Sequence, residues 1–233
     1  MHKSKIHNNI IIILFSIILA IIILFGSMNI IIFDKDFYYR EYTKNDVYSK
    51  ISTNNQNNNT AVDIAHNATI NIIDYFHDDA ELKYFTNDEK KHMADVKILI
   101  NLMTTIYYAA VVLSIILFVY CYVAFKKDKF MFVKIITRAI LYSSIFLIIS
   151  LLIIFLLSVF YFELLFVLFH LILFPQGNWT FDSTSFLITL FPQQFFFDIT
   201  LRIFVYALFQ AALFFGIGWW INKHLKIHEK HHI

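Results

Sequence analysis

The sequence has little charge and almost no cysteine, and each shortage excludes a class of protein. Among its 233 residues there is one cysteine, Cys121, so neither an intrachain disulfide framework nor a cysteine-based zinc site is expected. Charged residues make up 15% of the chain and hydrophobic residues 59%, a balance too apolar for a soluble domain. The formal net charge of +2 gives no indication of nucleic-acid binding. The composition therefore predicts a membrane protein whose partner is the lipid bilayer, with no nucleic acid.

Long apolar runs are what the sequence has in quantity. Four of them, residues 10–33, 98–125, 135–162 and 199–221, exceed the roughly 20 residues that a helix needs to cross a bilayer. They are continuous, whereas lipid-facing barrel strands alternate between apolar and polar residues. No A-x-A-like cleavage site follows the first run, so we expect a retained anchor and not a cleaved signal peptide. The expected fold is an all-α membrane protein with four transmembrane helices.

The basic residues give the expected orientation. They gather before the first span, between the second and third, and after the fourth, and these three segments share one side of a four-span protein. The positive-inside rule makes that side the cytoplasm, so both termini are expected inside. The expected division is N-terminal tail and first span 1–33, outward-facing loop domain 34–97, second span 98–125, basic cytoplasmic loop 126–134, third span 135–168, outer segment 169–198, fourth span 199–221 and basic cytoplasmic tail 222–233.

Two stretches of the outer loop have a local pattern. Residues 52–63, STNNQNNNTAVD, are rich in asparagine and bury little apolar area, so a loop is expected there. Residues 61–76 are typical of a short amphipathic helix that lies near the membrane. Further on, Thr86 and Glu89 form the T-x-x-E pattern of a capping box, which predicts a helix that starts at Thr86 and runs unbroken into the second span.

This capped helix carries the first histidine of interest. His92 lies about one turn before Val96, at the expected outer interface. Asp88, Glu89 and Asp95 are three or four positions from it, on or near the same face of the helix. The sequence thus places an ionisable imidazole among carboxylates at the outer end of the second span.

A second histidine follows the third span, in the stretch FHLILFPQGNWTFD at 169–182. Spans two and three are joined by a short loop, so they are antiparallel neighbours and His170 can meet His92. After the turn at 175–177, Asp182 or Ser183 is expected to cap a short helix over 185–197 that breaks at Pro192. That helix is too short to span, so we expect it to be interfacial or re-entrant.

These two blocks carry a family resemblance. The first is E-x-x-H-M-x-D-V at Glu89, His92, Met93, Asp95 and Val96; the second comprises Phe169, His170, Phe174, Trp179, Asp182, Leu187, Ile188, Phe191, Pro192, Phe195 and Phe196. With one anchor, an outer loop and three more helices, the chain resembles the lipoprotein intramolecular transacylases, Lit, over nearly its whole length. It departs from the family pattern at Gln193, where glutamate is usual, and at Phe186, where aspartate is usual. The resemblance therefore gives no support to a carboxylate role in that helix.

The resemblance implies an activity. An ester-linked acyl chain, the sn-2 one, would move from the diacylglyceryl group of a membrane lipoprotein's N-terminal cysteine to that cysteine's own α-amino group. The product would be a lyso-form lipoprotein. No cofactor or metal is implied, a monomer is expected, and the active site would face outward from the cell membrane.

The residues suit this reaction. Donor ester and acceptor amine belong to one molecule, and holding such a pair in place supplies about 7–11 kcal/mol of the barrier. A covalent nucleophile is then not obligatory, consistent with a chain that has no G-x-S-x-G elbow and whose Cys121 maps to the inner half of span two. We assign His170 as the base and His92 as its partner or oxyanion donor, and the reverse assignment stays open.

Other residues are expected to support the site. Glu89, Asp95, Trp179, Asp182 and Glu163 are the candidates. Trp179 could instead be an interface anchor, and Glu163 could extend to the headgroups or orient a histidine.

Two further charged features have a structural interpretation. Arg202 could pair with Glu163 or Asp198. The C-terminal HLKIHEKHH, with His224 and His228 at i, i+4, favours an anchor for anionic headgroups over a metal site.

Two other classes of function stay open. The same histidines could serve another lipid enzyme, an acyl hydrolase or intermolecular acyltransferase, which would release fatty acid or change the phospholipid pool. If the protein is instead a non-enzymatic membrane accessory protein, replacing either histidine by alanine would cause no chemical change.

Overall fold

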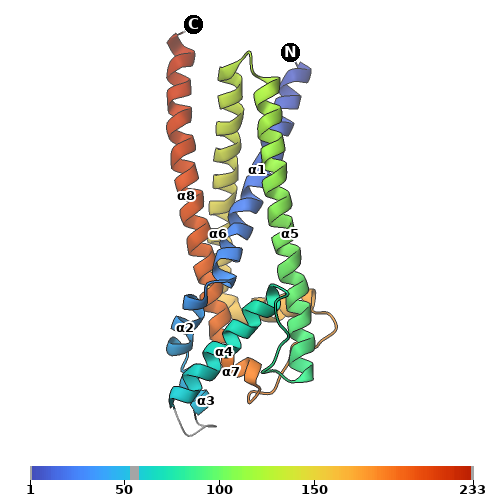
Figure 1. The fold of residues 1–233 in the computed structure, drawn as a ribbon. Helices are drawn as coiled ribbons and strands as arrows, with labels where there is room; N and C mark the ends of the chain where they lie inside the picture. Colours follow the sequence, from blue (N-terminus) through green and yellow to red (C-terminus); the bar gives the residue numbers. More distant parts are fainter. Residues whose placement is uncertain (1, 53–57, 232–233) are drawn as a thin grey trace. The chain divides into compact units, whose positions relative to one another are not determined.

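The computed structural model describes residues 2–52 and 58–231, and every regular element in this part of the chain is an α-helix (Figure 1). The helices are α1 His2–Ile32, α2 Lys35–Lys44, α3 Val47–Ser52, α4 Asn58–Phe76, α5 Asn87–Ala124, α6 Lys129–Leu173, α7 Phe186–Leu190 and α8 Gln193–His231. Four segments are long and apolar enough to cross a membrane, Lys5–Ile32, Asn87–Ala124, Lys129–Leu173 and Gln193–Ile227. The expected all-α fold with four candidate spans is confirmed.

The helices divide between two compact units. The first comprises Met1–Met28, Thr104–Phe155 and Ile203–Ile233, and the second comprises Asn29–Met103 and Leu156–Arg202. Part of the Asn-rich tract, residues 53–57, and the side chains of the tail from His228 onward lie outside the described residues.

In the first unit, small residues let the helices approach closely. Ala20 of α1, Leu147 and Leu151 of α6, and Ala207 and Ala211 of α8 share one buried cluster. Close approach of this kind is the usual basis of helix packing in membranes, where lipid is as apolar as the side chains. The beginning of α1, the end of α8 and the connection from α5 to α6 lie at one end of this unit (Figure 1).

Gly218 is one position where a side chain would not fit. A Cβ added there would lie 3.1 Å from the side chain of Leu141. Large apolar side chains on the other faces of the helices, such as Ile116 of α5 and Phe209 of α8, are exposed. This is the distribution of a bundle whose outer surface faces lipid.

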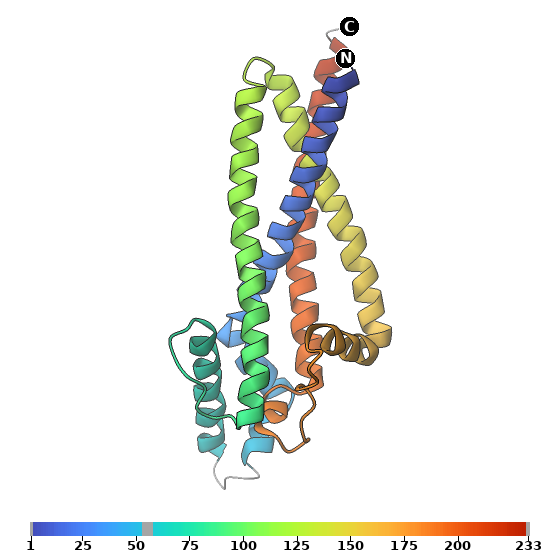
Figure 2. The same ribbon diagram turned by 90° about the vertical axis from the view of Figure 1, so that its right-hand side faces the viewer.

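In the second unit, α2, α3, α4 and α7 pack against one another (Figure 2). Aromatic rings also join α2 to the end of α7 and the start of α8: the Tyr38 ring lies 6.1 Å from that of Phe191 and 5.3 Å from that of Phe195. Tyr42 is fully buried, and its hydroxyl is 2.8 Å from the hydroxyl of Thr69 on α4. The second unit therefore has its own core. The expected amphipathic helix over 61–76 is present as most of α4.

Several helix boundaries differ from the expected ones. The expected helix over 185–197 is interrupted at Pro192, as expected, but only its first part is the short helix α7; the residues after Pro192 belong to α8, which begins six positions before the expected start of span four. The Pro192 carbonyl accepts from the Phe195 N–H at 2.8 Å, so proline stands at the beginning of α8. Proline has no N–H to donate, so α7 cannot continue through Pro192. At the start of a helix that N–H would have no partner within the helix, so proline is compatible with the beginning of α8.

The cap of α7 and the interior of α6 also differ from expectation. Ser185 is the N-cap of α7, and its hydroxyl accepts from the Ile188 N–H; neither Asp182 nor Ser183 has that place. α6 begins six residues earlier and ends five residues later than the expected span 135–168, and it is kinked at Tyr161, whose φ and ψ are −135° and 28°.

Candidate active site

Two histidines from different helices lie side by side in the second unit. The ring centroids of His92 on α5 and His170 on α6 are 6.2 Å apart, with 25° between the ring planes. Both side chains are buried, at 8% and 6% exposure. The sequence predicted this proximity, because α5 and α6 are antiparallel neighbours joined by a short connection.

The hydrogen bonding of His170 fixes its tautomer. Nδ1 lies 2.7 Å from the carbonyl oxygen of Phe166, one turn earlier on α6. A carbonyl oxygen only accepts, so Nδ1 carries the proton and Nε2 of the neutral ring has the free lone pair. The Trp179 ring lies 4.8 Å away with 34° between the planes, and the Phe166 ring lies at 4.2 Å. Both the protonation pattern and the ring position of His170 are thereby set.

Apolar rings pack around His92. The Phe174 ring lies 4.9 Å from it and the Phe181 ring 5.6 Å, both edge-on. Its Nδ1 is buried and has no hydrogen-bond partner among the described residues. A buried polar atom without a partner is uncommon in folded proteins, and functional sites are where such atoms are kept. His92 thus presents an unused nitrogen in the neighbourhood of His170.

Glu89 fixes the start of α5 and connects it to α7. Its Oε2 accepts from the N–H and the hydroxyl of Thr86 at 2.8 and 2.9 Å, which confirms the capping box. Its Oε1 accepts from the backbone N–H of Leu187 at 2.9 Å. At 1% exposure this carboxylate is one of the most buried polar groups of the described chain. It caps two helices at once, because unpaired N–H groups are found at the start of each.

Asp95, one turn after His92, fixes the turn that follows α6. Its Oδ2 accepts from the side-chain amides of Gln176 and Asn178 at 2.7 and 2.6 Å. Between these two residues Gly177 has a φ of +76°, in the left-handed region that glycine adopts without strain. The turn carries Phe174 at its start and Trp179 at its end, so Asp95 positions two of the rings around the histidine pair.

The other expected site residues lie elsewhere or serve local structure. Asp182 is exposed and accepts from the N–H and hydroxyl of Thr184, at 2.9 and 2.8 Å. Glu163 is exposed, and within residues 2–52 and 58–231 no contact joins it to either histidine. Asp198 is paired with Lys44 at 2.7 Å. Cys121 is fully buried in the first unit, 29 positions after His92 on α5.

Some contributors to the site were missed in the sequence. The Phe166 carbonyl could have been inferred, because it lies four residues before His170 on a helix. The ring of Phe181 and the amide of Asn178 had no such signal, since they reach His92 and Asp95 through a turn whose path the sequence does not specify. Among the described residues, no group of three or more histidine, cysteine or acidic side chains is placed to hold a metal ion.

Two comparisons with known proteins agree with each other, one with a protein family and one with solved structures. A family described as "Lipoprotein intramolecular transacylase Lit" matches residues 13–196 of the chain. The integral membrane protein Lit from Bacillus cereus, solved in meso, has a similar structure, with a TM-score of 0.79, 21% identity, and coverage of 96% of this chain and 99% of that one.

Two variants of the same Bacillus cereus protein, in which one histidine is replaced by arginine or by alanine, each give a TM-score of 0.76, at 20% and 21% identity. They cover 97% of this chain each, and 97% and 98% of their own. No curated protein sequence matches. The family match extends over both histidine blocks and most of the chain, and the structural likeness extends over nearly all of it. The chain therefore belongs to the Lit family of membrane-integral lipoprotein intramolecular transacylases.

Proposed function

We propose that His170 and His92 carry out the acyl transfer of this Lit transacylase, with His170 as general base and His92 as oxyanion donor. The substrate is a membrane lipoprotein with a free α-amino group on its diacylglyceryl cysteine. The amine nitrogen forms a bond to the carbonyl carbon of the sn-2 ester, and the bond from that carbon to the glycerol oxygen breaks. The proton lost by nitrogen ends on the glycerol oxygen.

The protonation pattern of His170 supports its role as the base. Its Nδ1–H is engaged by Phe166, which leaves Nε2 to accept a proton. An α-amino group titrates near 8, so about 10% is already neutral at pH 7. Nε2 takes the second amine proton as the tetrahedral intermediate forms and returns it to the departing glycerol oxygen. General acid–base catalysis of this kind contributes about 10²–10⁴ in rate.

The unpaired nitrogen supports His92 as the donor. Its buried Nδ1 has no described partner, and a neutral imidazole protonated there offers one hydrogen bond to a developing oxyanion. A single substrate group can reach both imidazoles, whose centroids are 6.2 Å apart. This separation is the observation that carries the proposal. No side-chain nucleophile takes part, because intramolecular transfer needs only positioning and proton transfer.

The test is mass spectrometry with fragmentation of a reporter lipoprotein, expressed in a host that leaves the cysteine amine free. The intact protein should convert it to an N-acyl, monoacylglyceryl peptide of unchanged mass. His170→Ala should lower conversion by about 10²–10⁴-fold, and His92→Ala by a smaller factor of about 10–100, because an oxyanion partner is lost but the base remains.

His77 provides a matched control. Its Nδ1 lies 2.9 Å from the carbonyl of Ile73, four residues before it, as His170 lies from Phe166. His77→Ala should therefore remove the same local bond and leave conversion intact. Full conversion by an inserted, abundant His170→Ala variant would exclude that histidine as the base. Conversion lost equally in His77→Ala would indicate a folding defect.

The outward orientation is part of the same proposal. Lysines and arginines occur at the start of α1, around the α5–α6 connection and at the end of α8, which share one end of the first unit (Figure 1). The positive-inside rule assigns that end to the cytoplasm. With four crossings, the start of α5, which carries Glu89, and the turn that carries Trp179 then face outward, where lipoproteins carry their modified cysteine.

A further inference from the structure

A basic cavity opens between α1 and α6 in the first unit, far in sequence from both histidine blocks. It has a volume of about 320 Å³, and its lining includes Lys5, Lys134 and Arg138, together with Ile12, Met131 and Ile135. We propose that this cavity binds the phosphate of an anionic phospholipid, whose glycerol and upper acyl chain lie on the apolar floor.

The charge of the cavity is of one sign. Its three ionisable lining residues are all cations, and no carboxylate lines it. The sequence has no Asp or Glu in residues 1–33 or 129–162, so neither helix brings an acid to it. None of the ion pairs found between described residues occupies Lys5 or Arg138. Lys5 and Arg138, two cations outside these ion pairs at the end of a membrane bundle, attract an anion.

The shape and floor of the cavity favour a lipid. Ile12 and Ile135 are buried at 4% and 1% exposure and belong to the cluster that also buries Cys121. Met131 accepts a weak hydrogen bond from the Asn8 amide at 3.8 Å, which brings α1 and α6 together at the rim. About two turns deeper, the Ser16 hydroxyl lies 3.1 Å from the Ala139 carbonyl and connects the same two helices. The cavity thus has a polar rim over an apolar base, which matches the polar headgroup and the apolar acyl chains of a phospholipid.

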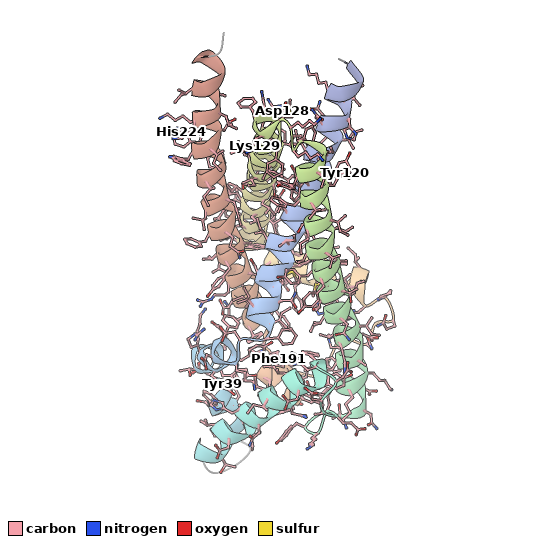
Figure 3. The ribbon with its side chains drawn as sticks, turned by 45° about the horizontal axis from the view of Figure 1, so that its top comes forward. Tyr39, Tyr120, Asp128, Lys129, Phe191 and His224 are labelled. Atoms are coloured by element: carbon pink, nitrogen blue, oxygen red, sulfur yellow. The ribbon has the colours of Figure 1, made fainter. Side chains whose placement is uncertain are left out.

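The position along the helices also fits a headgroup. Lys5 begins the first candidate span, and Arg138 lies nine residues into α6. Figure 3 places Asp128 and Lys129, at the start of α6, at the same end of the unit as Tyr120 and His224. Residues at the ends of membrane helices lie at the level of lipid phosphates, and basic pockets between helices are where such headgroups bind. The guanidinium of Arg138 suits two phosphate oxygens at once.

The chain offers a matched pair of charge-neutralising variants. Lys134→Gln/Arg138→Gln removes two cavity cations. Lys126→Gln/Lys127→Gln removes two exposed cations from the α5–α6 connection, at the same end of the unit, that do not line the cavity. The two variants have the same net charge. A difference in lipid retention between them is therefore due to the cavity and not to the overall positive charge of this end of the unit.

Native mass spectrometry of the purified full chain, released from detergent with dioleoylphosphatidylglycerol or dioleoylphosphatidylcholine, tests the proposal. The intact protein and Lys126→Gln/Lys127→Gln should each retain one phosphatidylglycerol in preference to phosphatidylcholine. The cavity variant should lower that population by about 25-fold, at roughly fivefold per cation removed, without changing retention of phosphatidylcholine.

Two results would overturn it. An equal loss in the two double variants would assign the preference to diffuse charge. Displacement of phosphatidylglycerol by millimolar inorganic phosphate would assign the cavity to a soluble anion. If the cavity variant does not fold, Lys5→Gln, at the exposed start of α1, should still lower retention about fivefold, and an unchanged value there would also count against the proposal.

Discussion

The backbone N–H of Leu187 at the start of α7 donates to Oε1 of Glu89 on α5, across 98 positions of sequence. The same carboxylate accepts the N–H of Thr86 at its other oxygen. Glu89 thus connects α5 to α7 in the second unit, and we expect its main contribution to be to the stability of the fold.

Glu89→Ala should destabilise the protein. It leaves the N–H groups of Leu187 and Thr86 without an acceptor, and an unpaired buried group costs about 1–3 kcal/mol. We expect a lower midpoint in thermal unfolding followed by circular dichroism, together with reduced conversion of the reporter. The exposed Glu163 provides the control, since Glu163→Ala should stay within about 0.5 kcal/mol. Equal unfolding midpoints for the two variants would contradict this stabilising role of Glu89.

Asp95 should act by positioning the turn after α6. Asp95→Ala releases Gln176 and Asn178, and the rings around the histidines lose their support. A displacement of about 1 Å at a catalytic group costs on the order of 100-fold in rate, so conversion should fall by about that factor. The exchange Asp95→Asn/Asn178→Asp restores one donor and one acceptor. It should recover much of the loss, while Asn178→Asp alone, with two carboxylates together, should not.

Trp179 should matter through its ring. The indole lies 4.8 Å from the imidazole of His170. Trp179→Phe retains an aromatic face and should keep most of the conversion, whereas Trp179→Ala should lower it by roughly tenfold, in keeping with a ring contact of about 0.5–1.5 kcal/mol plus lost positioning. Initial rates of reporter conversion measure both. Equal activity of the alanine and phenylalanine variants would leave Trp179 as an interface anchor.

Glu41 on α2 lies beside Asp198 on α8, and this pair of acids predicts a pH dependence of stability. Burial, then the hydrogen bond and charge of Asp198, raise the pKa of Glu41 above its ordinary value, against Lys44 and Arg40, which lower it. Because the pKa of Glu41 is higher in the folded state, the folded protein binds this proton more tightly than the unfolded chain does. The stabilisation that protonated Glu41 contributes is therefore fully present below pH 4.5 and is lost as pH rises through the folded pKa. Glu41→Gln should therefore raise the unfolding midpoint more at pH 7.5 than at pH 4.5. An equal change at both pH values would exclude titration of Glu41 as the cause.

The orientation can be tested with single cysteines, because the native Cys121 is fully buried. In intact cells, a membrane-impermeant maleimide should label Ser183→Cys and not Lys127→Cys, and lysis should expose the second. Labelling of Lys127→Cys in intact cells would reverse the proposed topology. Both positions are exposed, so access and not burial decides the result.

The sequence predicted the features that depend on neighbouring residues. Four apolar runs were enough for the candidate spans, and T-x-x-E was enough for the cap at Thr86. The pairing of His92 and His170 followed from the short connection between their helices. What it could not predict is non-local: the bond from Glu89 to Leu187, the two amides on Asp95, and the kink at Tyr161, where no proline or glycine gives a signal.

The contacts that join the helices of the candidate active site connect distant parts of the chain. His92 meets His170 after 77 intervening residues, and Asp95 and Glu89 bond to partners 81 to 98 positions later. During synthesis, the second span is therefore complete long before any partner of its histidine exists. On the proposed mechanism, the ribosome must produce α6, the turn and α7 before the two histidines can act together. We therefore expect an unfinished chain in the membrane to be inert toward the lipids around it, and activity to appear only once the last third of the chain has been made.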